Sequence, residues 1–428
     1  MLPMRSAAVR RFLSRLLVLL AVCPALLAQE KFRVQAVRVT GSQRFHQEDL
    51  IASTGLKPGD TVDVDALRSA ADRMMVTGAL AGVQYKYTPL SNGMLVEFTV
   101  TDSTDFLPCR YENLVWIAGD ELTKAVHEKV PLYDGEAPSS GELLDQIKQA
   151  ITDVLAQRGI LTIVRYELHA RGVGGPIDAI SFVSDSVRPK VQEITLTGAT
   201  LLTPEQKTES TKRLIGDEYT ASSLHDSLTE TLFSFYGNKG YLRMQVGEPQ
   251  AKLMGDPKQA LVAVTVPVTE GAQYRWKSAT WTGNSAIATA ELDKAVSLRP
   301  GDIADHSKLD QAMSQVQRDY KSKGFLNAKL QRTPDFDDTG HTVSYGIKVT
   351  EGDMFRMGTI HIGGLDQVVL DQLQKNWKLK PGDPYDQEYL QSFLHENVAL
   401  ITGTGRAKTV KVLQTPTSDK HVNVILEF

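Results

Sequence analysis

The residues of this sequence whose types and spacing could support chemistry lie in short acidic loops that follow a glycine. The stretch LKPGDTVDVDAL, residues 56–67, places Asp60, Asp63 and Asp65 within six positions. An EF-hand calcium loop needs oxygen ligands at several alternate positions and a closing glutamate. Related stretches, LRPGDIADHSKL at 298–309 and LKPGDPYDQEYL at 379–390, instead keep one aspartate at a position that suits a helix N-cap. We therefore predict structural turns here and no metal site.

Other candidates for catalysis or cofactor binding are weaker. The stretch GTGRAKT, residues 403–409, resembles a phosphate-binding loop but lacks the glycine directly before the lysine. The nine histidines form no H-E-x-x-H motif, no G-x-S-x-G elbow occurs, and Cys109 has no catalytic signature around it. We predict no catalytic residue, no metal, no cofactor, no small-molecule substrate and no enzymatic activity.

The segment at 1–28 has the layout of a secretory signal peptide. Four arginines precede the apolar run LLVLLAVCPALLA, which ends at Ala28. This run is short for a bilayer span, and Val22 fits poorly before a lipidated Cys23, so an uncleaved anchor and a lipoprotein remain as alternatives. Cleavage would take the net charge from −4 to −8 and leave Cys109 without a disulfide partner. Such an acidic chain without a basic run gives no support for nucleic-acid binding.

The glycine loops belong to a repeat with five copies. The loop glycine recurs at nearly equal intervals along the chain, and a second glycine recurs with the same period. The loop glycines are Gly59, Gly135, Gly216, Gly301 and Gly382, and the second set, the corner glycines, are Gly78, Gly159, Gly240, Gly324 and Gly405. Two landmarks that share one period indicate tandem supersecondary units.

Each copy predicts two helices. A residue with a capping side-chain oxygen stands four positions after each loop glycine, and a leucine stands eight positions after it. The predicted caps are Asp63, Ser139, Thr220, Asp305 and Asp386. From Leu309 the apolar residues follow helical spacing, and Gly324 then suits a left-handed C-cap. A shorter helix precedes the loop, as in TAELDKAVSL at 289–298.

Alternating apolar residues predict three strands in each copy. One strand opens the copy and ends at a glycine turn, as VQEITLTG does at Gly198. A second strand follows the corner glycine, where Leu242, Met244 and Val246 share one face, and ALVAVTVPV at 260–268 completes a hairpin. The resulting order is β-α-α-β-β. We predict an α+β fold of five tandem repeats that form an elongated arm.

A closing motif sets the repeat boundaries. VPVTEG ends at Gly271, and IKVTEGD spans the end of the next copy. We expect repeats at 31–103, 104–187, 188–271, 272–352 and 353–428, which are called the first to fifth repeats below. The second repeat diverges most, because it lacks a clear opening glycine turn and carries the insertion RGVGGP at 171–176.

The Pro-Gly-Asp turn, the aromatic-x-x-x-Gly-aromatic corner and the closing V-x-E-G resemble the POTRA (polypeptide-transport-associated) domain. The resemblance covers residues 31–428 and is most specific in the third to fifth repeats. It implies a periplasmic protein associated with the outer membrane, with no catalysis. In that family a membrane barrel follows the last POTRA domain, whereas HVNVILEF at 421–428 closes the fifth repeat, so we expect an arm without the barrel.

The resemblance also implies binding of unfolded outer-membrane proteins in their assembly or translocation, possibly with a separate barrel or lipoprotein subunits. A three-stranded sheet covered by helices leaves a strand edge to which an extended peptide can add. Our candidate edge is the predicted strand Tyr241, Leu242, Arg243, Met244, Gln245 and Val246. The alternative is a scaffold that joins envelope proteins through stable contacts of its helical faces.

Overall fold

The computed structural model describes residues 31–170, 175–403 and 410–428. The predicted signal peptide, Cys23 and Gly405 lie outside this part of the chain. Two compact units can be distinguished. One comprises the described residues within Met1–Arg110, Gly119–Val154 and Tyr166–Ser181, and the other comprises those within Tyr111–Ala118, Leu155–Arg165 and Phe182–Phe428.

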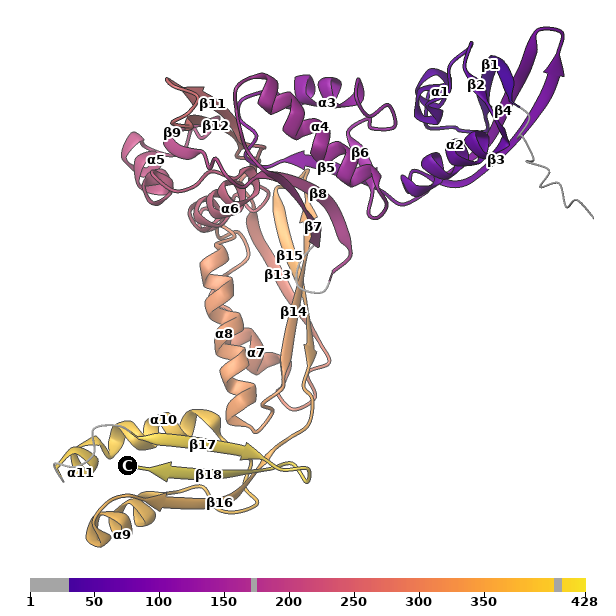
Figure 1. The fold of residues 1–428 in the computed structure, drawn as a ribbon. Helices are drawn as coiled ribbons and strands as arrows, with labels where there is room; N and C mark the ends of the chain where they lie inside the picture. The colour runs from indigo at the N-terminus through magenta and orange to yellow at the C-terminus, as the bar shows by residue number, and fades with distance from the viewer. Residues whose placement is uncertain (1–30, 171–174, 404–409) are drawn as a thin grey trace, which may run out of the picture. The chain divides into compact units, whose positions relative to one another are not determined.

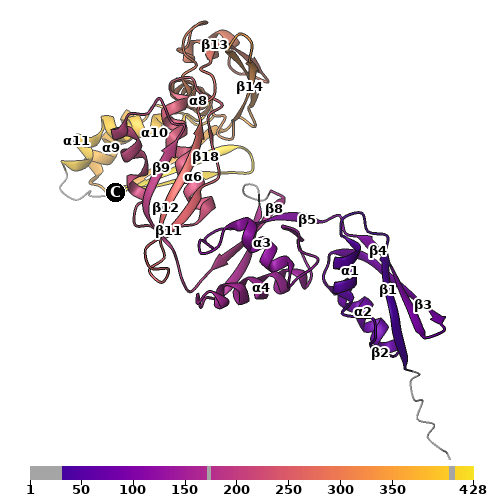
Figure 2. The same cartoon turned by 90° about the horizontal axis from the view of Figure 1, so that it is seen from above.

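The first repeat is a mixed sheet covered on one face by two helices (Figures 1 and 2). Its elements are β1 (Phe32–Thr40), α1 (Gln47–Thr54), β2 (Thr61–Val62), α2 (Val64–Val76), β3 (Leu80–Leu90) and β4 (Gly93–Asp102). The strands are hydrogen-bonded in the order β2-β1-β4-β3. β1 pairs with β4 in parallel, which requires a crossover through the helices, whereas β3 pairs with β4 in a tight antiparallel hairpin.

The second repeat has the same sequence of elements. They are β5 (Phe106–Tyr111), α3 (Gly119–His127), β6 (Glu136–Pro138), α4 (Leu143–Gln157), β7 (Val164–Ala170) and β8 (Ile177–Ser184), with sheet order β6-β5-β8-β7. The divergence seen in the sequence therefore leaves the order of strands and helices unchanged.

The third repeat carries an interrupted strand. It consists of β9 (Lys190–Thr197), α5 (Pro204–Thr211), the 3₁₀-helix η1 (Lys212–Leu214), α6 (Ala221–Gly237), β10 (Gln245–Val246), β11 (Gln250–Met254) and β12 (Leu261–Thr269). β12 is central, with β9 parallel on one side and β10 and β11 antiparallel on the other.

The fourth and fifth repeats follow the predicted β-α-α-β-β order most closely. The fourth comprises β13 (Arg275–Thr282), α7 (Thr289–Ala295), α8 (His306–Ser322), β14 (Lys329–Asp337) and β15 (Thr342–Thr350). The fifth comprises β16 (Arg356–Gly363), α9 (Gln367–Asn376), α10 (Gln387–Glu396), α11 (Val398–Thr402), β17 (Lys411–Pro416) and β18 (His421–Glu427). Their sheet orders are β13-β15-β14 and β16-β18-β17. The α+β class expected from the sequence is confirmed.

The core of each repeat forms between one helix face and the central strand. In the fourth repeat Leu309, Ala312, Val316 and Tyr320 of α8 are buried, and the core cluster of this repeat joins residues of α8 to alternate residues of β15. Burying one such aliphatic side chain contributes roughly 1.5–3 kcal/mol, so this helix is held by its apolar face more than by its propensity. The shorter helix α7 ends at Ala295 rather than at the expected 298, because the backbone of Val296 at its C-cap is extended.

Candidate functional site

The Pro-Gly-Asp loop is a turn closed by its own aspartate. Asp302 Oδ2 accepts the N–H of Arg299 at 2.8 Å, and Asp383 Oδ2 accepts that of Lys380 at 2.8 Å. Backbone hydrogen bonds of 2.8 Å in both directions also join the fourth repeat's loop to Trp276 in β13. In the first repeat Asp60, one of the carboxylates that resemble metal ligands in the sequence, accepts the N–H of Lys57 at 2.7 Å and so serves the local backbone in the same way.

The loop glycines are required by backbone conformation rather than by space. Gly59, Gly216, Gly301 and Gly382 have φ of +101°, +91°, +92° and +92°. A Cβ at any of the four would meet no atom within 4 Å. Glycine reaches this left-handed region without the penalty that an L side chain carries, so the turn selects it.

Three of the predicted caps hold a helix N-terminus. The carboxylate of Asp63 accepts the N–H of Ala66 at 2.9 Å, and Asp305 and Asp386 accept N–H groups of α8 and α10 in the same way. A capping carboxylate satisfies backbone donors that have no partner inside the helix and lies at the positive end of its dipole.

Thr220 is the N-cap residue of α6, as predicted, but its side chain accepts no hydrogen bond from the helix, so that part of the prediction is wrong. The N–H groups at the start of α6 are accepted by Glu112, with its Oε2 at 2.9 Å from Ser222 N and its carbonyl at 2.8 Å from Ala221 N. Glu112 is 3% exposed, and a buried carboxylate at a helix N-terminus is a stronger acceptor than a hydroxyl. It lies 110 positions from Ser222, which no local pattern could reveal. Ser139 is not a cap either, because α4 begins only at Leu143.

Two corner glycines, Gly240 and Gly324, lie where one repeat meets the next, whereas a Cβ at Gly159 would meet no atom within 4 Å. The carbonyl of Gly240 accepts the N–H of Tyr274 at 2.8 Å, and that of Gly324 accepts the N–H of Phe355 at 2.8 Å. A Cβ would lie 2.6 Å from the carbonyl oxygen of Tyr274 at the first position and 2.4 Å from that of Phe355 at the second. The corner glycine thus ends a helix with a left-handed residue and also admits the backbone of the next repeat.

The closing glutamate of the V-T-E-G motif fixes the turn after the first strand. Glu270 accepts hydrogen bonds from the Thr200 hydroxyl (2.6 Å), the Leu201 N–H (2.8 Å) and the Tyr236 hydroxyl (2.6 Å). Burial, reinforced by the bond to Glu270, raises the pKa of Tyr236 above its ordinary value. Desolvation opposes ionisation of Glu270, but these donors outweigh it and lower its pKa. Sequence reasoning used this glutamate as a landmark and missed its role.

The predicted strand over Tyr241–Val246 is wrong in extent. The chain at 241–244 forms a turn, and only Gln245 and Val246 pair with β12, at Thr269 and Val268. The chain then leaves the ladder and resumes pairing at Gln250 in β11. The alternation of Leu242, Met244 and Val246 has another cause, since Leu242 packs on the core of the fourth repeat while the other two pack in the third.

Arg243, the centre of the predicted edge, is engaged in the contact between the third and fourth repeats. Its Nη1 donates to both carboxylate oxygens of Asp338 at 2.7 and 2.8 Å, and its guanidinium lies 4.9 Å from the centre of the Phe336 ring. The hydroxyl of Tyr274 also donates to Asp338. These hydrogen bonds from Tyr274 and Arg243 lower the pKa of Asp338.

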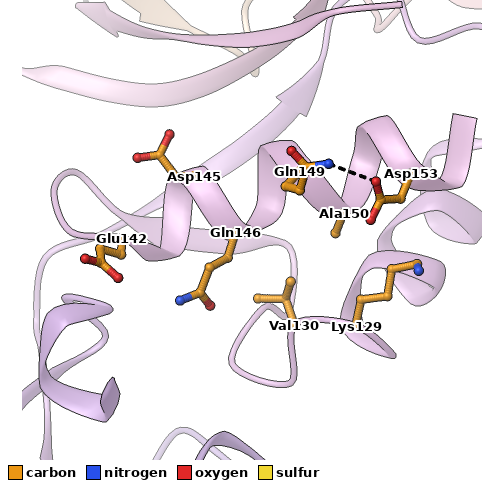
Figure 3. A pocket seen from close by; sticks show the side chains of 8 residues that line it. All are labelled: Lys129, Val130, Glu142, Asp145, Gln146, Gln149, Ala150 and Asp153. Carbon is orange, nitrogen blue, oxygen red and sulfur yellow. Dashed lines mark hydrogen bonds between the residues drawn. The ribbon is translucent and has the colours of Figure 1, made fainter. Parts of the chain in front are cut away.

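A pocket of about 650 Å³ lies against α4 in the second repeat (Figure 3). Two of its acids bond to neighbours on the same helix, with Gln149 Nε2 donating to Asp153 at 2.9 Å and Lys148 Nζ to Asp145 at 2.5 Å. Asp145 and Asp153 do not point toward one another in Figure 3. Within the described ranges, no group of three His, Cys, Asp or Glu side chains is arranged to hold a metal ion.

Cys109, the one cysteine within the described part of the chain, is poorly suited to reaction. Burial, with the negative charges of Asp134 and Glu136 nearby, raises the pKa of Cys109 to about 12, although a hydrogen bond with Tyr133 opposes the shift. The thiolate, which is the reactive form, is therefore scarce at neutral pH. None of the helices in the described part of the chain combines the length and apolar character needed to cross a membrane.

Comparison with known proteins assigns the family. Residues 274–352 match the model of the POTRA family, described as a surface antigen variable number repeat. The protein therefore contains a POTRA domain. The matched residues coincide with the fourth repeat, the copy in which Tyr274, Gly301 and Gly324 make the contacts described above, so this POTRA domain is the reference for the other repeats.

Similarity to assembly factors extends beyond this POTRA domain. The outer membrane protein assembly factor BamA of Neisseria meningitidis is 20% identical over 384 residues, which are 88% of this chain and 47% of that protein. BamA of Buchnera aphidicola is 19% identical over 400 residues, or 90% of this chain and 62% of that protein. A crystal structure of POTRA3-5 of Haemophilus influenzae BamA is 21% identical with a TM-score of 0.41, covering 56% of this chain and 95% of that one. The chain spans less than two thirds of the length of these two curated relatives.

Proposed function

We propose that this POTRA-domain chain is a non-enzymatic periplasmic arm in outer-membrane protein assembly or translocation, which binds unfolded outer-membrane proteins by strand addition. The similarity to two assembly factors over most of the chain supports the process. The strand edges support the mechanism, and they are the observation on which the proposal rests.

Each sheet in the described residues ends, on the side of the hairpin that closes the repeat, in a strand with only one paired neighbour. These terminal strands are β3, β7, β11, β14 and β17. An edge strand carries main-chain N–H and C=O groups that no neighbouring strand satisfies. An extended polypeptide can form hydrogen bonds with these groups, and its side chains then contribute little to recognition. That weak selectivity suits clients with different sequences, each of which must later form strands.

A binding experiment with the exported chain tests this proposal. Urea-unfolded outer-membrane proteins of different sequence, labelled with a fluorophore, are diluted into the chain, and anisotropy measures the complexes. We expect reversible binding of several unfolded clients and none of the same proteins once folded in detergent. Absence of binding to every unfolded client, together with a stoichiometric complex with one folded envelope protein, would establish the scaffold instead.

A further inference from the structure

We propose that the free edge of β3 in the first repeat is the strand to which an extended client segment adds. The inference rests on the proposed function and names the place where it acts. It moves the binding edge from the third repeat, where the sequence suggested it, to the longest terminal strand of the described sheets, at 11 residues.

The register of the β3–β4 hairpin shows which main-chain groups face outward. Pro89 lies opposite Met94 and has no N–H, so this pair is not hydrogen-bonded. Hydrogen-bonded and non-bonded pairs alternate along an antiparallel ladder. The N–H and C=O groups of Val83, Tyr85 and Tyr87 therefore point away from β4, and no other described strand pairs with them.

The two faces of β3 differ in polarity, which defines the occupant. Val83, Tyr85 and Tyr87 lie opposite the core residues Val100, Phe98 and Val96, and Tyr87 is still 41% exposed. The other face is polar: the Lys86 ammonium lies 3.3 Å from Glu97. An added strand that alternates apolar and polar residues would continue both faces, with its apolar side chains beside Tyr85 and Tyr87. Such alternation is the sequence signature of the strands of membrane barrels.

The next longest edge, that of β14, is blocked at its centre. β14 has 9 residues, and Pro334 lies opposite Tyr345 in its middle. Hydrogen-bonded and non-bonded pairs alternate in this ladder too, and Pro334 lies in a non-bonded pair. The N–H that proline lacks would therefore have pointed away from β15. An incoming strand would lose a hydrogen bond there and meet the pyrrolidine ring, which is a known means of protecting sheet edges.

The shorter edge strands offer fewer main-chain groups for pairing. The edge of the third repeat is broken between Val246 and Gln250, where the chain reads Gly-Glu-Pro. β17 is shorter than β3 and ends at Pro416. β7 lacks proline but is also shorter, so it offers fewer main-chain groups than β3. On the opposite side of the sheets β9, β13 and β16 have 8 residues each, and the backbone of the glycine loop in the same repeat bonds to the start of each strand, so these edges are partly covered. β7 is therefore the competing edge in the experiment below.

The test uses a synthetic peptide, about as long as β3, that alternates apolar and polar residues, with a shuffled peptide of equal composition as control. Photocrosslinking residues are placed in the full exported chain at Gln84 of β3, Glu167 of β7 or Thr333 of β14. Gln84 and Thr333 are matched, because both are exposed and both lie in ladder positions next to an outward-facing residue. We expect the alternating peptide to crosslink from position 84 and not from 167 or 333.

Two variants and one modified peptide separate main-chain pairing from side-chain contact. Tyr85→Pro removes an outward N–H and should weaken peptide binding by about tenfold or more, whereas Tyr85→Ala, which keeps it, should have a smaller effect. A peptide with N-methyl groups along one edge should not bind the unaltered chain, and this result does not depend on how well Tyr85→Pro folds.

The outcomes distinguish the two proposals. Binding that is abolished by N-methylation but crosslinks from 167 or 333 would overturn the β3 assignment and leave strand addition intact. Equal binding of the N-methylated and plain peptides would reject strand addition itself, and with it the mechanism in the proposed function. Failure of all peptides and all unfolded clients to bind would reject both proposals.

Discussion

The first and fourth repeats share a topology and differ at the strand edge. Both pair their first strand in parallel with the last and their penultimate strand antiparallel to it. The free edge of β3 runs without a proline until Pro89, next to the hairpin turn, whereas β14 carries Pro334 at its centre. The same fold can thus present an edge or protect it by the position of one residue.

What the two repeats share is the corner glycine. Gly78 and Gly324 have φ of +77° and +89°, and a Cβ would lie 2.2 Å from the carbonyl oxygen of Ser140 and 2.4 Å from that of Phe355. The contact to the next repeat therefore constrains the corner glycine in the same way in both places. The edge is free to vary, because no neighbouring strand depends on it.

The largest expected effect is at this shared corner. Gly78→Ala and Gly324→Ala should each lower the free energy of unfolding by roughly 3–5 kcal/mol, because a left-handed alanine costs about 1–2 kcal/mol and the overlap with a backbone oxygen adds a similar or larger amount. Urea unfolding measures both. Gly301→Ala is the control, since it also has positive φ but open space around its Cβ, and it should lose only about 1–2 kcal/mol. Equal losses at 301 and 324 would refute the packing argument.

The next largest effect is expected from a substitution that removes the difference between the edges of β3 and β14. Pro334→Thr restores an outward N–H at the centre of β14 and should create a second binding edge, with affinity for the alternating peptide within about tenfold of that at β3. Titration should show the stoichiometry rise from one peptide to two, with new crosslinks from position 333. Thr333→Ala is a control that leaves Pro334 in place. An unchanged stoichiometry in a folded Pro334→Thr chain would mean that the proline does not block this edge.

A smaller effect concerns the closing acid, which differs between the repeats. In the fourth repeat Glu351 accepts a hydrogen bond from Tyr320, as Glu270 does from Tyr236 in the third, whereas Asp102 of the first accepts backbone N–H groups of Gln43 and Arg44. Glu270→Gln should cost about 1–2 kcal/mol at neutral pH, because charge-assisted hydrogen bonds are lost.

The pH dependence of this loss follows from the lowered pKa of Glu270. A carboxyl with a lower pKa when folded contributes stability that is present above its unfolded pKa, near 4.5, and that is lost as pH falls through the folded value. The difference between the wild-type chain and Glu270→Gln should therefore shrink below about pH 4.5 in urea unfolding. A difference that stays constant from pH 7 to pH 3 would show that the ionised form of Glu270 is not what stabilises the turn.

Local patterns predicted the parts of this fold whose causes are local. Helix α8 follows from the capping Asp305, an apolar stripe and the corner glycine Gly324, which all lie in one short segment, and the structure has it at His306–Ser322. The prediction of a strand over 241–246 was wrong in extent. Alternating apolar residues indicate which side chains are buried, but they do not show that the backbone pairs with another strand. Leu242 is partly buried against the neighbouring repeat, so the segment alternates without forming a ladder.

The candidate site depended on information that the sequence holds only at long range. The outward direction of Tyr85 follows from its register with Phe98, which the hairpin sets, and the cap of α6 comes from Glu112 in the preceding repeat. Pro334 was visible in the sequence, but its meaning required knowing that β14 is an edge. Strand order is a property of tertiary packing, and repeats of nearly equal length do not determine it.

The smallest effect probes the polar face of β3. Glu97 lies 3.7 Å from Arg38 and 3.3 Å from Lys86, across three neighbouring strands. The two basic side chains are mostly exposed, and surface ion pairs are screened, so Glu97→Gln should cost less than about 1 kcal/mol, and less still at high salt. Because the main-chain groups of β3 are untouched, the peptide should bind this variant as well as the wild type. A loss of binding as large as that from Tyr85→Pro would mean that the charges on this face, rather than the open edge, select the client.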